Sequence, residues 1–546
     1  MVTPLEERIE RPTRPAHRLF GGAALALLFL LAVGARFVGI TLFITPDEDN
    51  WMRRAGNFAQ ALERRDLFRT FQSGHPGVTT MWLAIAGVGP EISRLAGVTV
   101  QDHPVTREPG FMELLIRARY AFILVNSALV VAIVALGWRL LGAGPALLGG
   151  VLMALDPFLV AHGQVVHVDA LATGFMTVAI LAAGVYWWAN GRPRYLVLCG
   201  VASGLAVLTK APSLVLGLLI PVVVLAAPFL DRAAWPIPRL LGSLIVAGSI
   251  GVAVVIVAWP SIWVAPVETV ERAVRFTLDT SSEHRPGNYF MGRAVADPGP
   301  MYYSVAVMYR LAPLALAGLV ALGVLLPHRS ARRPTYLLLL FVVGFVAFLE
   351  LASKKLDRYT LPAFPSLDLL AGLGLWTLGL WIVPWLAQHG LSRERRSLAI
   401  AVAAVAVVAA QALPLAMVAP YALAFYNPLV GGAPAAARVL LVGWGEGLDG
   451  VAEYLNAQPN PERQLIAVYF PLELNFQGMV AGTVTQYGDP RPVDYVVDYI
   501  SAAQRAQTPP EVIGRVPDHE VRINGLLYAR VYHFSPPRAI LPTPGV

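Results

Sequence analysis

Apolar runs of about 20 residues recur along most of this 546-residue chain, and they constrain its fold more than any other feature. A helix of that length crosses roughly 30 Å of hydrocarbon. Only 14% of the residues are charged, against roughly a quarter in soluble domains, so an ordinary soluble enzyme is excluded. The runs predict about eleven membrane-spanning helices, near residues 20–43, 117–138, 142–160, 168–189, 195–209, 212–230, 239–259, 305–326, 335–352, 360–386 and 398–419.

Arginines predict the orientation of these helices. Positive residues in short connections favour the cytoplasmic side, and the arginines of the N-terminal tail and of alternate connections share one side if eleven spans are present. Residues 1–19 are therefore expected to be a cytoplasmic tail of a multi-pass cell-membrane protein. The loops 44–116 and 260–304 and the tail 420–546 are then extracytoplasmic. Because the arginines flank the predicted spans, we expect contact with membrane lipid and no nucleic-acid partner.

The C-terminal tail has the pattern of a small α/β domain. Its expected elements are strands at 437–442, 464–470 and 493–499, a helix at 447–457, and a hairpin over 521–533 around Asn524-Gly525. The predicted fold class is thus an all-α polytopic membrane domain over residues 20–419, followed by an extracytoplasmic α/β domain over 420–546.

A glycine-rich segment, Gly443-Trp444-Gly445-Glu446-Gly447, mimics a dinucleotide-binding fingerprint. Its spacing is G-x-G-x-G, whereas the fingerprint is G-x-G-x-x-G, and the segment is predicted to lie outside the cell. A plain strand, turn and helix is the favoured interpretation.

Charged residues avoid the centres of the predicted spans and gather at their outer ends and in the outer loops, with Arg36 the main exception. This distribution favours chemistry at the outer membrane surface, on a substrate whose tail lies in lipid. The alternative is a transporter or flippase of lipid-linked sugars without transfer chemistry. Charges near the bilayer midplane would favour that alternative.

Three acids follow the first predicted span directly: Asp47, Glu48 and Asp49 come after Pro46. Carboxylates in such a position suit a general base or a cation site. An acid at a helix start also favours the helix as an N-cap. The motif alone leaves these two interpretations about equal.

Histidines and acids also occur in two further outer segments. His75 precedes a predicted helix and could orient a substrate or bind a metal, or it could be a solvated loop residue. The hairpin around 156–169 holds Asp156, His162, His167 and Asp169. Because the two histidines are five residues apart, substrate or acceptor contacts are favoured over zinc. For Asp156, capping of a helix end is an equal alternative.

Lysine is rare in this chain and is confined to predicted outer turns. Only three of the 42 basic residues are lysines: Lys210, Lys354 and Lys355, the last two close to Arg358. Ammonium and guanidinium groups at the outer membrane interface are suited to bind a lipid phosphate or pyrophosphate. Snorkelling at helix ends is the alternative, but it needs no preference for lysine. Phosphate binding is therefore favoured.

The second large loop mixes aromatic and hydrogen-bonding residues, among them His284, Asn288 and Tyr289. Sugars are commonly held by surfaces of this composition. An interfacial loop held by an aromatic belt would have a similar composition.

At these residues the chain resembles the GT-C class of membrane glycosyltransferases, specifically the protein O-mannosyltransferase and aminoarabinose-transferase relatives. The resemblance spans most of residues 20–365 and depends on the order of its motifs: Asp47-Glu48, His75-Pro76, Asp156 to Asp169, Thr209-Lys210, Asn288 to Pro300, and Lys354-Lys355 to Pro362.

The resemblance implies a polyprenyl-phosphate sugar donor, an outer-face active site and inverting transfer. Asp47 would be the base or the acceptor-orienting carboxylate, supported by Glu48. The group of Lys354, Lys355 and Arg358 would receive the donor phosphate.

Other parts of the site follow less closely from the resemblance. His75 and His284 would contact substrate or a divalent metal, and the sequence leaves the metal requirement open. Gly77 stands where the mannosyltransferases usually have a second proline, and no carbohydrate-binding MIR domains interrupt the chain. The acceptor is therefore unknown, and it could be a lipid, a glycan or a protein.

The separation of acids in the first outer loop from cations in a later turn fits transfer from a phosphate leaving group. A glycosidase needs a carboxylic acid of raised pKa to protonate its leaving oxygen. A phosphate leaves as a stable anion, so one base and a cationic clamp suffice. The hypothesis from sequence is that Asp47 takes the acceptor's proton while Lys355 and Arg358, together with Lys210, stabilise the departing phosphate.

Overall fold

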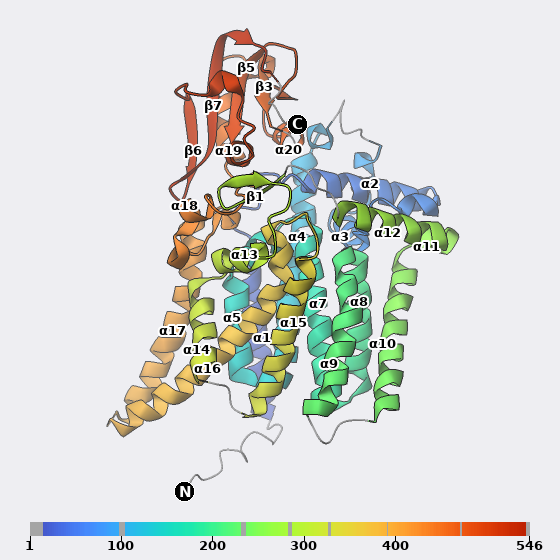
Figure 1. Cartoon of the computed structure of the whole chain (residues 1–546), viewed down its shortest axis with the longest axis vertical. Helices are drawn as coiled ribbons and strands as arrows, with labels where there is room; N and C mark the ends of the chain where they lie inside the picture. The colour runs from blue at the N-terminus through green and yellow to red at the C-terminus, as the bar shows by residue number, and fades with distance from the viewer. Residues whose placement is uncertain are drawn as a thin grey trace.

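The computed structural model describes residues 15–97, 104–230, 236–281, 287–325, 329–389, 391–469 and 472–541. A helical bundle carries the large loops and the C-terminal sheet at one end, while helix α1 (Pro15–Arg36) begins at the other (Figure 1).

Helices lie in each of the eleven predicted membrane spans. They are α1 (Pro15–Arg36), α4 (Phe111–Leu141), α5 (Ala143–Leu155) with α6 (Pro157–Gly163), α7 (Val168–Gly184) with the π-helical turn η5 (Val185–Asn190), α8 (Pro193–Thr209), α9 (Leu216–Leu230), α10 (Ile237–Ala258), α13 (Tyr302–Arg310) with α14 (Pro313–Leu325), α15 (Arg329–Leu349), α16 (Phe364–Gln388) and α17 (Arg393–Val418).

By length and composition, six helices in the described parts of the chain could each cross a membrane, and two bent pairs would raise this number to eight. Three other predicted spans contain shorter apolar helices, namely Gly21–Arg36, Pro193–Thr209 and Ala211–Leu225. The multi-pass architecture is therefore confirmed, and the number eleven stays a prediction.

Proline causes the two bends. Pro157 begins α6 and Pro313 begins α14, and the paired helices meet at 61° and 113°. A proline has no amide hydrogen to donate, and it disfavours helical backbone in the residue before it. The first bend places Asp156 at the junction between α5 and α6.

Glycines on α16 allow the bundle to pack closely. A Cβ on Gly374 would overlap the backbone oxygen of Gly318 on α14, and a Cβ on Gly372 would overlap Gly149 on α5. Small residues at helix crossings let backbones approach in this way, as is typical of membrane bundles.

Shorter helices form the outer loops. These are α2 (Glu48–Glu63), α3 (Val78–Val88), α11 (Ser261–Val264) and α12 (Pro266–Ser281), with a small hairpin of β1 (Asn288–Phe290) and β2 (Arg293–Val295). Helices α2 and α12 lie across the end of the bundle (Figure 1). Within the described residues, the loop-bearing end is therefore largely covered by helices.

The C-terminal domain contains a mixed five-stranded sheet of order β4-β3-β5-β7-β6. Strand β3 is parallel to β4 and β5, while β7 is antiparallel to β5 and β6. Its elements are α18 (Gly432–Ala436), α19 (Leu448–Asn456), β3 (Leu465–Val468), α20 (Glu473–Phe476), β4 (Thr483–Gln486), β5 (Val493–Tyr499), α21 (Ile500–Gln504), β6 (His519–Ile523) and β7 (Leu526–Arg538).

The predicted helix after Gly447, the strands near 464–470 and 493–499, and the hairpin at Asn524-Gly525 are confirmed. The strand predicted at 437–442 is wrong. Of that segment only Leu440 forms a bridge, to Phe290 of β1 in the outer-loop hairpin, and it does not join the five-stranded sheet. A partner distant in sequence thus decided the conformation of these apolar residues.

Candidate active site

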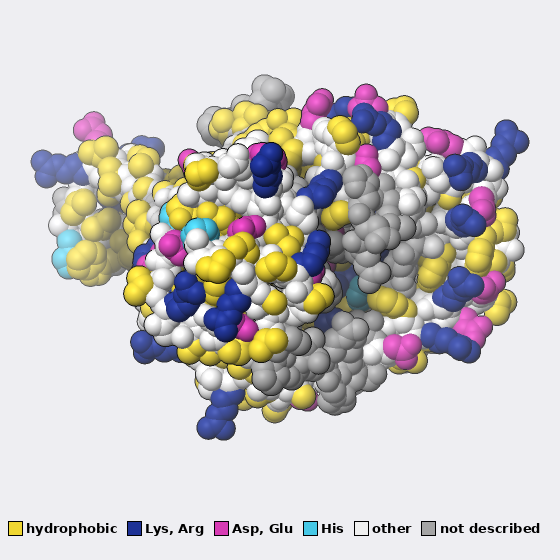
Figure 2. All heavy atoms as spheres, turned by 90° about the horizontal axis from the view of Figure 1, so that it is seen from above, with side chains coloured by type: hydrophobic (Ala, Val, Ile, Leu, Met, Phe, Trp, Pro, Cys, Tyr) yellow, Lys and Arg dark blue, Asp and Glu magenta, His cyan; other side chains and the backbone are white. Residues whose placement is uncertain are grey.

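Four segments that are distant in sequence meet at the loop-bearing end of the bundle. Asp47 lies between α1 and α2, and Asp169 lies in the first turn of α7. Lys210 follows the last residue of α8, and Arg358 lies in the 3₁₀ helix η7 (Asp357–Ala363) that precedes α16. Asp47 therefore sits at the start of the outer helix α2, and the other three side chains sit where a bundle helix begins or ends. The loop-bearing face seen from above carries many acidic and basic side chains (Figure 2).

These four side chains form a row of alternating charge. Arg358 Nη2 lies 3.1 Å from Asp47 Oδ2, and Arg358 Nε lies 3.4 Å from Asp169 Oδ2. Lys210 Nζ lies 2.5 Å from Asp169 Oδ1. The Asp169 side chain is 2% exposed, whereas that of Asp47 is 34% exposed. The row is therefore open to its surroundings at Asp47.

His167 joins the two acids from a second direction. Its Nε2 lies 3.5 Å from Asp47 Oδ2, and its Nδ1 lies 3.2 Å from Asp169 Oδ2. Burial alone would lower the pKa of His167, but the two carboxylates outweigh burial and raise it. Burial alone would raise the pKa of Asp47, but Arg358 and His167 outweigh burial and lower it. Asp47 is thus held as a carboxylate.

Aromatic rings cover the cations. Lys210 Nζ lies 4.1 Å from the centroid of the Tyr359 ring, and the Arg358 guanidinium lies 4.6 Å from that of Trp444. The Trp444 ring also meets the His167 ring edge to face, with 5.3 Å between centroids. The C-terminal domain segment thus reaches the charge row.

Glu48 lies in the interior beside this row. It is fully buried and forms a two-pronged ion pair with Arg119 of α4, with a 2.8 Å contact between Nε and Oε1. Its carboxylate also accepts hydrogen bonds from the backbone amides of Thr45 and Val166. Glu48 therefore ties the Asp47 turn to α4 and to the segment that bears His167.

His75 faces the same region from the loop before α3. Its ring packs edge to face on Phe276 of α12, and its buried Nδ1 has no hydrogen-bond partner among the described residues. Burial and the positive charges of Lys210 and Arg54 together lower the pKa of His75 to about 3. His75 is therefore a neutral imidazole beside a cluster of cations.

Asp156 has the capping role that the sequence left open. Its Oδ1 accepts hydrogen bonds from the amides of Phe158 and Leu159 at 2.9 Å, and the side chain is fully buried. Its contacts therefore belong to the helix junction, and its predicted role in substrate binding stays a prediction.

Lys355 is buried and pairs with acids outside the charge row. Its Nζ lies 3.3 Å from Glu350 and 3.4 Å from Asp297, and the side chain is 2% exposed. Asn288 accepts from the Lys355 amide and donates to the backbone oxygens of Ala296 and Ser353. These contacts fasten the turn that bears Arg358 to the second outer loop, where Tyr289 is also buried.

His284 and Lys354 are the remaining residues that the sequence predicted for this site. His284 lies outside the described residues. Lys354 is half-buried, and its positive charge acts on His75. Within the described parts of the chain, no group of three His, Cys, Asp or Glu residues is arranged to hold a metal ion.

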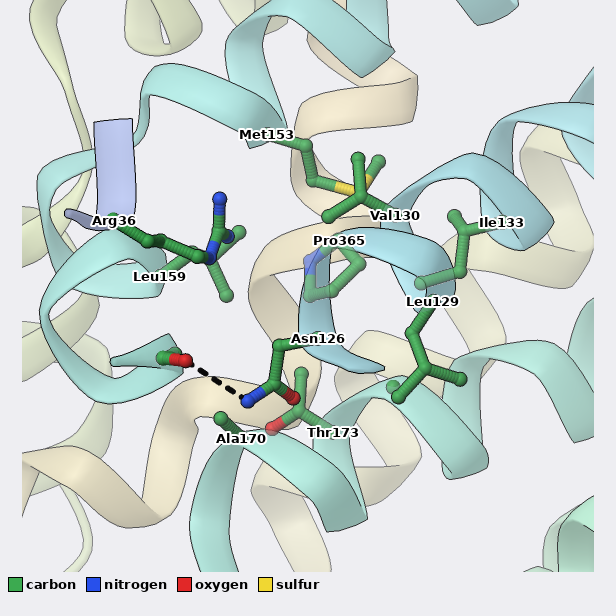
Figure 3. A pocket seen from close by; sticks show the side chains of 12 residues that line it. Arg36, Asn126, Leu129, Val130, Ile133, Met153, Leu159, Ala170, Thr173 and Pro365 are labelled. Carbon is green, nitrogen blue, oxygen red and sulfur yellow. Dashed lines mark hydrogen bonds between the residues drawn. The ribbon is translucent and has the colours of Figure 1, made fainter. Parts of the chain in front are cut away.

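A separate cavity lies inside the bundle, lined mostly by apolar side chains of α4, α5 and α7 (Figure 3). Arg36 points toward it, and Asn126 on its wall donates to the backbone oxygen of Gly163 at 3.0 Å. Asp47, Asp169 and Arg358 are not among its lining residues. The cavity is therefore distinct from the charge row.

Sequence reasoning missed Arg119, Arg54 and Trp444. Arg119 is the third residue of the predicted span 117–138. An arginine within a membrane span needs an acidic partner, and Glu48 supplies it. Trp444 lies in the glycine-rich segment that was assigned to an ordinary turn. Arg54 lies five residues after Asp49 on α2, the helix that begins at the acidic motif.

Taken together, the fold and this site define a multi-pass membrane protein with a charged cluster at the helix ends on one side and a mixed α/β domain above it. Residues 111–259, from the start of α4 to just beyond α10, match the family model described as dolichyl-phosphate-mannose-protein mannosyltransferase.

Solved structures share the fold over almost the whole chain. ArnT from Cupriavidus metallidurans bound to undecaprenyl phosphate superposes with a TM-score of 0.51 at 15% identity, covering 95% of this chain and 98% of that chain. The apo state of the same protein gives 0.52 at 18% identity, covering 94% and 98%. No curated protein sequence matches this chain significantly. The predicted resemblance is therefore confirmed in the fold shared with ArnT and in the family match over residues 111–259.

Proposed function

We propose that this protein transfers a sugar from a polyprenyl-phosphate donor to an acceptor hydroxyl or amine at the outer face of the membrane, with inversion at the anomeric carbon. One observation carries the proposal: the row Asp47, Arg358, Asp169 and Lys210 places two cations beside a partly exposed carboxylate. The mannosyltransferase family match and the undecaprenyl phosphate bound to ArnT support this choice of donor.

The reaction needs one displacement. The acceptor oxygen or nitrogen forms a bond to the anomeric carbon while the bond from that carbon to the phosphate oxygen breaks. The electron pair leaves with the phosphate, whose charge Arg358 and Lys210 offset. The acceptor proton passes to Asp47, which acts as the general base.

Arg358 links donor binding to the basicity of Asp47. Without a donor, Arg358 pairs with Asp47 and helps to hold the pKa of that carboxyl below its usual value. A donor phosphate competes for the same guanidinium. As Arg358 turns toward the phosphate, Asp47 loses a stabilising partner and its pKa rises, so it becomes a stronger base when the donor is present.

Neighbouring residues have supporting roles in this proposal. Glu48 acts through its ion pair with Arg119, which holds the turn of Asp47 in place. Lys354 adds positive charge on the phosphate side, and Lys355 fastens the turn that carries Arg358. His75 offers a neutral imidazole nitrogen to the substrate.

The direct test is to incubate the purified full-length protein in detergent with labelled polyprenyl-phosphate sugars, and to measure sugar transfer or hydrolysis. Asp47→Asn should reduce turnover by about 10²- to 10⁴-fold, the usual effect of losing a general base. Asp66→Asn is the matched control, because Asp66 lies in the same loop, is 47% exposed and forms an ion pair with Arg69.

Wild-type turnover by the Asp47→Asn variant would remove Asp47 from the mechanism. If the wild-type protein moved the donor lipid across liposome membranes with its sugar intact, and released no sugar, the flippase alternative would replace the transferase.

A further inference from the structure

Among the described residues of the C-terminal domain, Trp444 is the one whose ring contacts both Arg358 and His167 of the candidate active site. Its ring lies 4.6 Å from the Arg358 guanidinium and meets His167 edge to face. The ring centroid of His162 lies 5.5 Å from that of Trp444. A cation over an indole face is attracted to it, and more strongly where water is excluded. Trp444 therefore holds the guanidinium that also pairs with Asp47.

The glycine spacing around Trp444 follows from where the loop runs. Gly443 and Gly445 have φ values of +94° and +104°, which residues with a Cβ rarely adopt. A Cβ on Gly443 would lie 2.7 Å from the Tyr499 ring, and one on Gly445 would lie 3.0 Å from the backbone oxygen of Ile44. The loop thus passes between strand β5 and the segment that leads to Asp47.

A buried hydrogen-bond network fixes the loop around the tryptophan. The Trp444 amide donates to the Glu446 carboxylate, and the Gly445 amide donates to the Tyr499 hydroxyl at 3.1 Å. That hydroxyl donates to the backbone oxygen of Glu446 at 2.9 Å. Glu446 itself is 2% exposed. Because both the backbone and its partners are fixed, Trp444 projects from a rigid support.

We propose that Trp444 is a positioning residue of the active site, so that the C-terminal domain sets the direction in which Arg358 meets the donor phosphate. The inference rests on the proposed function and extends it to the C-terminal domain. Trp444 acts through Arg358 and His167 and forms no bond with the reacting atoms.

This role predicts a defect in donor binding. If the indole face is lost, Arg358 gains freedom to turn away from the phosphate, which weakens its contact with the bound donor. Because the leaving phosphate gains negative charge as its bond to the sugar breaks, the contact is also weakened in the transition state, and kcat falls while KM rises. We expect Trp444→Ala to raise the donor KM by about 10- to 30-fold, the usual range of a desolvated cation–π contact. Trp444→Phe should restore most of the affinity, since it keeps an aromatic face.

The test compares these two variants of the full chain with Tyr454→Ala. Tyr454 is an aromatic residue of the same domain, but its ring stacks on His519 of β6. Donor KM and kcat would be measured with labelled polyprenyl-phosphate sugar. Binding of undecaprenyl phosphate without a sugar would be measured separately, so that one measurement does not depend on turnover.

The outcomes separate the inference from the proposed function. A raised donor KM and weaker undecaprenyl-phosphate binding in Trp444→Ala, recovered by Trp444→Phe and absent in Tyr454→Ala, would support the inference. Wild-type values in Trp444→Ala, or an equal defect in Tyr454→Ala, would overturn it. Absence of turnover by the wild-type protein would overturn the proposed function, and the binding measurement would still decide the role of Trp444.

Discussion

Arg358 and Lys355 lie three residues apart in one turn, yet their surroundings differ. Arg358 reaches Asp47 and is 18% exposed, whereas Lys355 is 2% exposed and pairs with Glu350. Two cations that sequence reasoning placed in one phosphate clamp therefore have unequal access to a substrate. The difference arises because their neighbours come from separate parts of the chain.

This difference is measurable as donor affinity. Arg358→Gln should raise the donor KM by about tenfold or more, because it removes a charge-assisted contact to the phosphate. Lys355→Gln should mainly lower the thermal stability, because it leaves Glu350 with an uncompensated charge. Donor KM and melting temperature of both variants would check this. Equal rises in donor KM would show that Lys355 also binds the phosphate.

The buried carboxyl of Asp49 leads to a second prediction, about how the stability of the protein depends on pH. Burial and the negative charge of Asp47 together raise the pKa of Asp49 to about 7. An unfolded chain has an Asp pKa of about 3.9. The folded state therefore binds the proton more tightly, and this contribution to stability is present at low pH and is lost as the pH rises through about 7.

We expect Asp49→Asn to remove this part of the pH dependence. Between about pH 4 and pH 7 the melting temperature of the wild-type protein in detergent should fall, relative to that of the variant, by a few °C. Thermal unfolding at fixed ionic strength would measure it. Parallel curves for the two proteins would contradict the prediction, and the exposed Asp66→Asn serves as control.

The apolar pattern located the spans but not their bends: the predicted spans 142–160 and 305–326 run through Pro157 and Pro313, where the helices bend. The hairpin at Asn524-Gly525 was predicted from its turn residues. The segment 437–442 differs, because its apolar residues could have joined a sheet. Its bridge to Phe290 depends on contacts that no local pattern encodes.

Glycines of α16 allow a test of helix packing. Gly374→Ala should lower the melting temperature by several °C, because the new methyl group would overlap the backbone of α14 at Gly318. Gly379→Ala is the matched control on the same helix, since nothing lies within 4 Å of the added Cβ. The control should be neutral or slightly stabilising, because alanine favours a helix over glycine. Equal melting temperatures of the two variants would contradict this packing.

The whole molecule places its large loops and its C-terminal domain at one end of the bundle (Figure 1). The sequence predicts that this end is extracytoplasmic. Cys199 is the only cysteine of the chain and is 1% exposed, so an introduced cysteine can be labelled selectively. Val516 in the C-terminal domain is 88% exposed, and Ser392 between α16 and α17 is also exposed.

A membrane-impermeant maleimide should therefore label Val516→Cys in intact cells, and label Ser392→Cys only after the cells are made permeable. Gel detection of the labelled protein would report both. The reverse pattern would show that the charge row faces the cytoplasm. Labelling of both positions in intact cells would contradict a bundle that separates these two residues.

The sequence alone determined the membrane architecture. The length of each apolar run and its scarcity of charge are local properties, and they decide whether a helix is stable in the hydrocarbon core of a membrane. It also identified Asp47, Asp169, Lys210 and Arg358 as candidates, since polar residues at the ends of apolar runs are few. Only the tertiary structure decided which charges pair. Ion pairs and ring contacts extend over a few ångströms in space, whereas Asp169 and Lys210 lie 41 residues apart in the chain and Asp47 and Arg358 lie 311 apart. For the same reason, the roles of Glu48, Lys355 and Trp444 became visible only when the chain was folded.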